Sequence, residues 1–361
     1  MKLFSRFNSG KISFKNRLVM APMTRCRAIG NIPNDLMAKY YSQRAEAGLI
    51  ITEGTSPSPN GLGYARIPGI FNHAQVEGWR KVTNAVHAGG SNIFLQMMHT
   101  GRISNNINMP PDSLVVAPSE IKAAGMMWTD QQGMQEHNIP VALTTMGIQT
   151  TIGEFVTGAN NAIAAGFDGV ELHAANGYLL EQFLSPHSNI RTDNYGGNIE
   201  NRLRFVLEII EKVANAVGKD KTGIRISPFG TFNDMPEYAE VFDTYALLAE
   251  KLNNLGIAYI HVINHPSLDK QFNGRTLKQV IRENFHQAII FGNGYNLDSA
   301  NKALQNNEAD FIAFGRAFIN NPDLVQRLAH DLPLAQEADQ STFYTPGEKG
   351  YIDYAPSPAI G

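Results

Sequence analysis

The sequence predicts an α/β fold in which residues 1–361 form a single (β/α)8, or TIM, barrel domain. Two observations lead to this prediction. Short apolar segments rich in β-branched residues alternate with longer segments of helical period, which is the pattern of βα units with a parallel sheet. The chain holds eight such apolar segments, and eight strands close a barrel of this kind.

The predicted strands are continuous apolar runs, as expected for strands that are buried on both faces. In chain order they occupy residues 18–23, 49–54, 92–98, 168–174, 222–228, 259–264, 288–294 and 311–317. The helical segments that follow them occupy residues 35–47, 74–87, 153–165, 199–217, 239–255, 277–284, 298–305 and 322–330. Nothing between these units suggests a second domain.

Two segments lie outside the βα repeat. Residues 5–17 precede the first strand, and we expect them to form an N-terminal hairpin at the floor of the barrel. Residues 101–148 follow the third strand and are rich in Pro, Met and Asn with weak periodicity. They predict a long loop excursion, of the kind that serves as a lid or stays disordered.

Composition and charge exclude several classes of function. The formal net charge is −3 and no Lys/Arg cluster occurs, so neither nucleic acid nor a membrane surface is an expected partner. No apolar stretch is long enough for a signal peptide or a membrane span, which predicts a cytoplasmic protein. The single cysteine, Cys26, cannot form a thiolate cluster alone, so we expect no metal and a structural role for Cys26. A monomer and a homodimer are equally compatible with the sequence.

Active sites of such barrels lie at the C-terminal ends of the strands, and the densest polar segment there is residues 170–197. His173 ends the fourth predicted strand, and Asn176 and Tyr178 follow it directly. Two neutral donors three residues apart can hold one developing oxyanion, and a nearby phenol can supply a proton. Taken alone, His173 could also be a core histidine and Tyr178 a packing residue.

Glycines follow the last two predicted strands, in the sequences FGNG and FGR. Barrels often bind phosphate with the loops after strands seven and eight, where backbone N–H groups are accessible. We therefore predict a phosphate site at Gly292, Asn293, Gly294, Gly315 and Arg316. As bare patterns, the same residues could form ordinary βα turns.

Several motifs together resemble the old yellow enzyme family. They are HAANGYL followed by QFLSPHSNIRTDNYGG, APMTR at residues 21–25, FLQMMHTGR at 94–102 and FGRAFINNPDL at 314–324. The matches keep the family's order from residue 16 to about residue 354. The resemblance implies a flavoprotein with bound FMN, an NAD(P)H-dependent ene-reductase of the NADPH dehydrogenase type. NADPH or NADH would be the hydride donor, and an enone, a nitroalkene or a similar activated alkene the substrate.

The resemblance also implies which residues hold the flavin. It places Pro22, Met23 and Thr24 along the ring, and Gly54 and Gln96 at its pyrimidine edge. Arg225 matches an arginine near N1 and the C2 carbonyl, where a fixed cation would stabilise the reduced flavin.

For the substrate, the resemblance implies that His173 and Asn176 hold its carbonyl or nitro oxygen while Tyr178 protonates it as general acid. The residues expected to line the substrate pocket are Tyr64, Met98, Phe232 and Tyr351. Met98 departs from the family, since many members carry tryptophan there, and a flexible side chain would reshape the pocket.

Two other classes of function remain open because fold does not fix function. A flavin-free barrel lyase would use a Schiff-base lysine, but no lysine lies at the C-terminal end of a predicted strand. A non-catalytic FMN-binding barrel would have no need of Tyr178 beside His173 and Asn176. We therefore predict an oxidoreductase.

Overall fold

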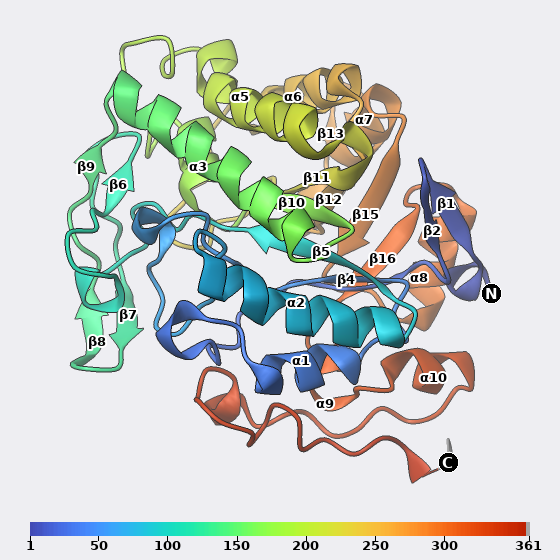
Figure 1. The fold of residues 1–361 in the computed structure, drawn as a ribbon. Helices are drawn as coiled ribbons and strands as arrows, with labels where there is room; N and C mark the ends of the chain where they lie inside the picture. The colour runs from blue at the N-terminus through green and yellow to red at the C-terminus, as the bar shows by residue number, and fades with distance from the viewer. Residues whose placement is uncertain (359–361) are drawn as a thin grey trace.

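The computed structural model describes residues 1–358, which contain a closed barrel of eight parallel strands (Figure 1). Strand β16 pairs with β3, Phe314 lying opposite Met20, and this pairing closes the barrel. Each observed strand lies within a predicted one, and the predicted fold class is confirmed. The strands are β3 (Leu18–Met20), β4 (Leu49–Ile51), β5 (Asn92–Met97), β10 (Gly169–Ala174), β11 (Thr222–Ile226), β12 (Tyr259–Ile263), β15 (Ala288–Gly292) and β16 (Phe311–Phe314).

Helices surround the barrel, as the alternating pattern predicts (Figure 1). They are α1 (Asp35–Ser42), α2 (His73–Ala88), α3 (Thr145–Ala164), α5 (Ile199–Val217), α6 (Val241–Leu255), α7 (Leu277–Asn284), α8 (Leu297–Gln305) and α10 (Leu324–Ala329). Two short helices were not expected, α4 (Leu179–Leu184) and α9 (Ala317–Asn320). Among residues 1–358, no helix has both the length and the apolarity needed to cross a bilayer.

Helix α3 begins eight residues before its predicted start at residue 153. The Thr144 side chain accepts a hydrogen bond from the Gly147 backbone N–H at 3.0 Å and caps the helix. Counting the cap, residues 144–153 contain four threonines and two glycines, which have low helix propensity and conceal the helical period in the sequence.

The barrel interior is filled by apolar side chains at its N-terminal end. Phe14, Phe94, Tyr259 and Phe311 belong to one buried cluster with their aliphatic neighbours. The Phe14 ring meets the Phe311 ring edge-on at 5.0 Å. Phe14 belongs to an antiparallel hairpin formed by β1 (Phe7–Ser9) and β2 (Ile12–Phe14), which packs on this end of the barrel. With one end filled, the polar residues of the strands are left at the other end.

The excursion after β5 is built from short strands rather than a structureless loop. Strands β7 (Met126–Thr129) and β8 (Gly133–Glu136) form an antiparallel hairpin, and β6 (Val116–Ala117) pairs with β9 (Val141–Ala142). Figure 1 shows the β7–β8 hairpin and the N-terminal β1–β2 hairpin at opposite ends of the barrel. The excursion therefore stands at the C-terminal ends of the strands.

The C-terminal segment returns along α1 and α9 to the same end of the barrel (Figure 1). Two buried arginines from the loop after β3 hold its backbone. Arg25 donates to the Phe343 carbonyl at 3.1 Å and to the Gly350 carbonyl at 2.6 Å. Arg27 donates to the Phe343 carbonyl at 2.6 Å. These bonds attach residues 342–350 to the rim of the barrel.

Candidate active site

A cavity of about 380 Å³ opens at the C-terminal ends of the strands. Ten of the residues predicted from the sequence line it: Pro22, Thr24, Tyr64, Gln96, Met98, His173, Asn176, Tyr178, Arg225 and Phe232. These residues come from distant parts of the chain, so the closure of the barrel brings them together.

His173 and Tyr178 lie side by side in this cavity, with ring centroids 4.9 Å apart. Burial, together with the neighbouring Arg225 and His261, lowers the pKa of His173 well below its ordinary value, so the imidazole is neutral. Burial raises the pKa of Tyr178, so its hydroxyl keeps the proton, and that hydroxyl lies 3.1 Å from the Tyr64 hydroxyl. The pair therefore offers a neutral imidazole and a protonated phenol.

The turn between His173 and Tyr178 has an unusual backbone. Asn176 and Gly177 have φ angles of 58° and 74°, in the left-handed region that asparagine and glycine tolerate best. A side chain at Gly177 would also meet the Phe232 carbonyl oxygen at 2.8 Å. The Asn176 N–H donates to the Ser227 hydroxyl at 2.8 Å, which anchors the turn to the loop after β11.

A buried carboxylate that sequence reasoning missed supports this turn. Glu181 of α4 accepts hydrogen bonds from the Gly177 N–H at 2.6 Å, the Ser227 hydroxyl at 2.7 Å and the Tyr245 hydroxyl at 2.9 Å. Burial raises the pKa of Glu181 from 4.5 to about 7, although the three donors oppose that rise. The signal in the sequence was a single acid inside the apolar segment LLEQFL.

A second polar cluster lies across neighbouring strands. Glu171 of β10 accepts from Gln96 Nε2 at 2.8 Å and lies 2.9 Å from His261 Nδ1. In the strand register, Arg225 of β11 stands between His173 of β10 and His261 of β12. Glu171 and His261 were also missed, although Glu171 lies two residues before His173 and therefore on the same face of its strand.

Several buried polar atoms at the mouth of the barrel have no hydrogen-bond partner within residues 1–358. They include His173 Nδ1, Arg225 Nε and His261 Nε2, one from each of three adjacent strands, and Asn264 Oδ1 just beyond β12. His173 and Arg225 line the cavity. Buried polar groups are normally paired, so the unpartnered atoms of these two residues point to a bound polar molecule. A planar cofactor with hydrogen-bonding groups along one edge fits this set of atoms.

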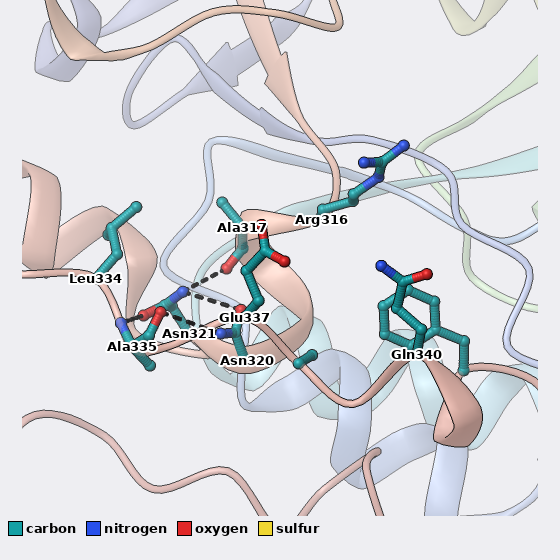
Figure 2. Close-up of a pocket in the computed structure, with 10 residues that line it drawn as sticks. Arg316, Ala317, Asn320, Asn321, Leu334, Ala335, Glu337 and Gln340 are labelled. Carbon is teal, nitrogen blue, oxygen red and sulfur yellow. Dashed lines mark hydrogen bonds between the residues drawn. The ribbon is translucent and has the colours of Figure 1, made fainter.

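The predicted phosphate residues lie at the ends of β15 and β16. Asn293 and Gly294 have φ angles of 76° and 81°. A Cβ at Gly294 would meet no atom of residues 1–358 within 4 Å, so the backbone there is open to a ligand. Arg316 is exposed and borders a second cavity of about 210 Å³. Figure 2 shows its guanidinium directed away from Asn320 and Asn321. The side chains of these two asparagines donate hydrogen bonds to the backbone carbonyls of Ala335 and Ala317, respectively.

One pocket prediction needs correction. Tyr351 does not line the cavity; it is fully buried and stacks on Tyr40 of α1 at 4.1 Å. The tail segment instead contributes Tyr344 to the cavity. The tail has no βα pattern, and its path depends on the bonds from Arg25 and Arg27 to its carbonyls, which the sequence alone does not reveal.

Two further predicted residues lie outside the cavity lining. Met23 is partly buried against the core. Gly54 leaves room for the Met98 side chain, because a Cβ at position 54 would lie 2.5 Å from Met98 Sδ. The remaining lining residues that sequence reasoning missed are Cys26, Ala65, Arg66, Met126, Met127, Trp128 and Met134.

The barrel and the cavity at the C-terminal ends of its strands, in which a few polar side chains converge, define an enzyme with a cofactor site. The model of the NADH:flavin oxidoreductase / NADH oxidase family matches residues 2–335, and the chain belongs to this family. It is an FMN-dependent oxidoreductase, as the motifs predicted.

Individual relatives match over nearly the whole chain. A probable flavin mononucleotide-dependent alkene reductase of Leishmania infantum is 41% identical over 94% of this chain and 93% of its own. A rice (Oryza sativa subsp. japonica) 12-oxophytodienoate reductase 1 is 39% identical over 98% and 92%. Morphinone reductase superposes with a TM-score of 0.92 at 40% identity, covering 98% of this chain and 96% of that one. The old yellow enzyme homologue of Zymomonas mobilis gives 0.92 at 37% identity over 98% and 99%.

Proposed function

We propose that the enzyme reduces the activated C=C bond of α,β-unsaturated carbonyl or nitro compounds, with NAD(P)H as the source of reducing equivalents. The observation that carries this proposal is the convergence of a neutral His173, Asn176 and a protonated Tyr178 on one cavity. The names of the relatives, which include an alkene reductase, support it.

We propose further that the whole chain acts as one FMN-binding domain. Arg225, whose buried Nε has no hydrogen-bond partner among residues 1–358, is suited to hold the electron-rich edge of the flavin. The other residues proposed to hold the ring are Pro22, Met23, Thr24, Gly54 and Gln96, and those proposed to hold the phosphate are Gly292, Asn293, Gly294, Gly315 and Arg316. When bound, FMN supplies the hydride that it has taken from NAD(P)H.

The chain's own residues would bind and polarise the substrate. His173 and Asn176 donate hydrogen bonds to the carbonyl or nitro oxygen, which draws electron density away from the double bond. Because His173 is neutral and already desolvated, it donates without first losing a hydration shell.

Tyr178 would deliver the proton that completes the reduction. Its hydroxyl lies in the cavity, and burial keeps the proton on it at neutral pH. The Tyr64 hydroxyl, 3.1 Å away, is a group that can return a proton to it. A cytoplasmic location and a monomeric or homodimeric state remain predictions of the sequence.

The test of these roles is Tyr178→Phe, followed in the two half-reactions separately. Flavin reduction by NADPH should keep its wild-type rate, because no proton from Tyr178 is needed there. Reoxidation by 2-cyclohexenone should slow by about 10²-fold or more, the usual contribution of a general acid. Equal slowing of both half-reactions would remove Tyr178 from the role of proton donor.

A further inference from the structure

Five large apolar side chains stand exposed around the mouth of the active-site cavity. We call them the apolar lip: Met126, Trp128, Met134, Phe232 and Tyr344. Each is between 51% and 62% exposed, yet all five line one cavity. A cluster of exposed apolar groups at a cavity rim marks a surface that is covered when a ligand binds.

Three members of the lip share one face of the β7–β8 hairpin. Trp128 lies directly opposite Met134 in the strand register, and Met126 lies two residues before Trp128 on the same face. The alternate residues Met127 and Thr129 are buried on the other face. The hairpin is thus fixed to the protein by one face and presents two methionines and a tryptophan on the other.

A single arginine ties the two sides of the lip together. Arg66 donates to Asp130 at the hairpin turn and to the Tyr344 carbonyl at 2.8 Å. Asp130 in turn accepts from Trp128 Nε1 at 3.1 Å. Arg66 also donates to the Cys26 carbonyl at 3.0 Å, which anchors it to the loop after β3. The Trp128 indole and the Tyr344 backbone are therefore held in place before any ligand arrives, which lowers the entropic cost of binding.

The charges along the cavity restrict what the lip can accept. Within residues 1–358, the only basic side chains of lysine or arginine that line this cavity are Arg66 and Arg225. Arg66 is already bound to Asp130 and two carbonyls, and Arg225 lies beside His173 on the barrel strands. A carboxylate placed at the lip would lose water without gaining a cationic partner.

We propose that the apolar lip binds the part of the substrate that is not reduced, and that this part is an uncharged, flat aromatic or polycyclic group. Methionine sulfur and the rings of tryptophan and tyrosine all make favourable contacts with planar apolar groups. The flexible methionines allow several ring shapes to fit. This inference rests on the proposed function, because it assumes that the reacting end of the same molecule lies at His173 and Asn176.

Three enones that differ only at the distal end test the proposal. They are ethylideneacetone, which carries a methyl group, benzalacetone, which carries a phenyl ring in its place, and the para-carboxylate of benzalacetone. The wild-type enzyme should have its highest kcat/KM for benzalacetone and a lower value for the carboxylate. In Trp128→Ser and in Met126→Ser with Met134→Ser, the ratio of kcat/KM for benzalacetone over ethylideneacetone should fall about tenfold, a typical loss for one aromatic contact.

The matched control is Met146→Ser, which changes an equally large methionine that is 78% exposed on α3 and lies outside the cavity. It should leave the ratio unchanged. FMN content and melting temperature identify any variant that has failed to fold. An unchanged ratio in the lip variants, or faster turnover of the carboxylate than of benzalacetone, would overturn the proposal.

A binding measurement separates this proposal from the proposed function. The chain has two tryptophans, and the second, Trp79, is fully buried. Benzalacetone should quench the emission of the oxidised enzyme, and Trp128→Phe should abolish that quenching. If no enone is reduced but this quenching occurs, the proposed function is wrong and the proposed binding of an aromatic group at the apolar lip is supported. If enones are reduced without any quenching that depends on Trp128, the lip assignment fails.

Discussion

Glu181→Gln removes the ionisable group that supports the turn carrying Asn176 and Tyr178. The carboxylate accepts hydrogen bonds from the Gly177 N–H, the Ser227 hydroxyl and the Tyr245 hydroxyl. Glutamine has nearly the same size, and both hydroxyls can rotate to accept from its amide. The variant should therefore fold, and it differs from the wild type chiefly in that its side chain does not titrate.

The pKa of Glu181 rises on folding from 4.5 to about 7, so folding favours the protonated form. The contribution of Glu181 to the free energy of unfolding is fully present below pH 4.5 and is lost as the pH rises through 7. The difference corresponds to about 3 kcal/mol, most of which is lost between about pH 5 and about pH 8. For a chain of 361 residues, that loss is worth about 3 °C in melting temperature.

The assay is a comparison of melting temperatures of the two proteins across this pH range. Relative to Glu181→Gln, the wild type should lose about 3 °C between about pH 5 and about pH 8. Other buried acids, such as Glu53, are present in both proteins and cancel in the difference. Glu211→Gln, at an exposed position of α5, is the control and should give a constant difference. A constant difference for Glu181→Gln as well would contradict a raised pKa of the buried Glu181 carboxyl.

Two further changes test the turn and its packing. His173→Ala combined with Asn176→Ala should abolish the binding of phenolic ligands while FMN stays bound. Binding is measured from the change that a phenol causes in the flavin absorption spectrum. A normal affinity for phenols would show that these two residues do not hold the oxyanion. Gly101→Ala should destabilise the protein by more than about 1 kcal/mol, because Gly101 has a φ of 61° and a Cβ there would lie 2.2 Å from Gln182 Oε1. An unchanged melting temperature would contradict that packing.

The sequence predicts the barrel well because its strands are buried on both faces. A buried strand such as Asn92–Met97 or Gly169–Ala174 reads as an uninterrupted apolar run, and eight of these with helices between them leave few alternative folds. The placement of His173 and Arg225 follows from the same pattern, since both residues stand near the C-terminal ends of predicted strands.

What the sequence does not reveal are contacts that arise only when the barrel closes. Glu171 and Glu181 look like ordinary polar residues of a strand and a helix, and their partners lie between four and ninety residues away. Tyr344 lines the cavity and Tyr351 does not, because of the path that the tail follows. That path depends on hydrogen bonds from Arg25 and Arg27 to tail carbonyls more than 300 residues away. Local propensity and periodicity contain no information about such pairs.

The proposed activity of this barrel is the transfer of hydride equivalents from NAD(P)H to an activated alkene through FMN. The most direct test is the absorption spectrum of the purified holoenzyme under anaerobic conditions, first with NADPH and then with 2-cyclohexenone. We expect NADPH to bleach the flavin absorption and the enone to restore it. A flavin that NADPH reduces but that no activated alkene reoxidises would contradict the claim.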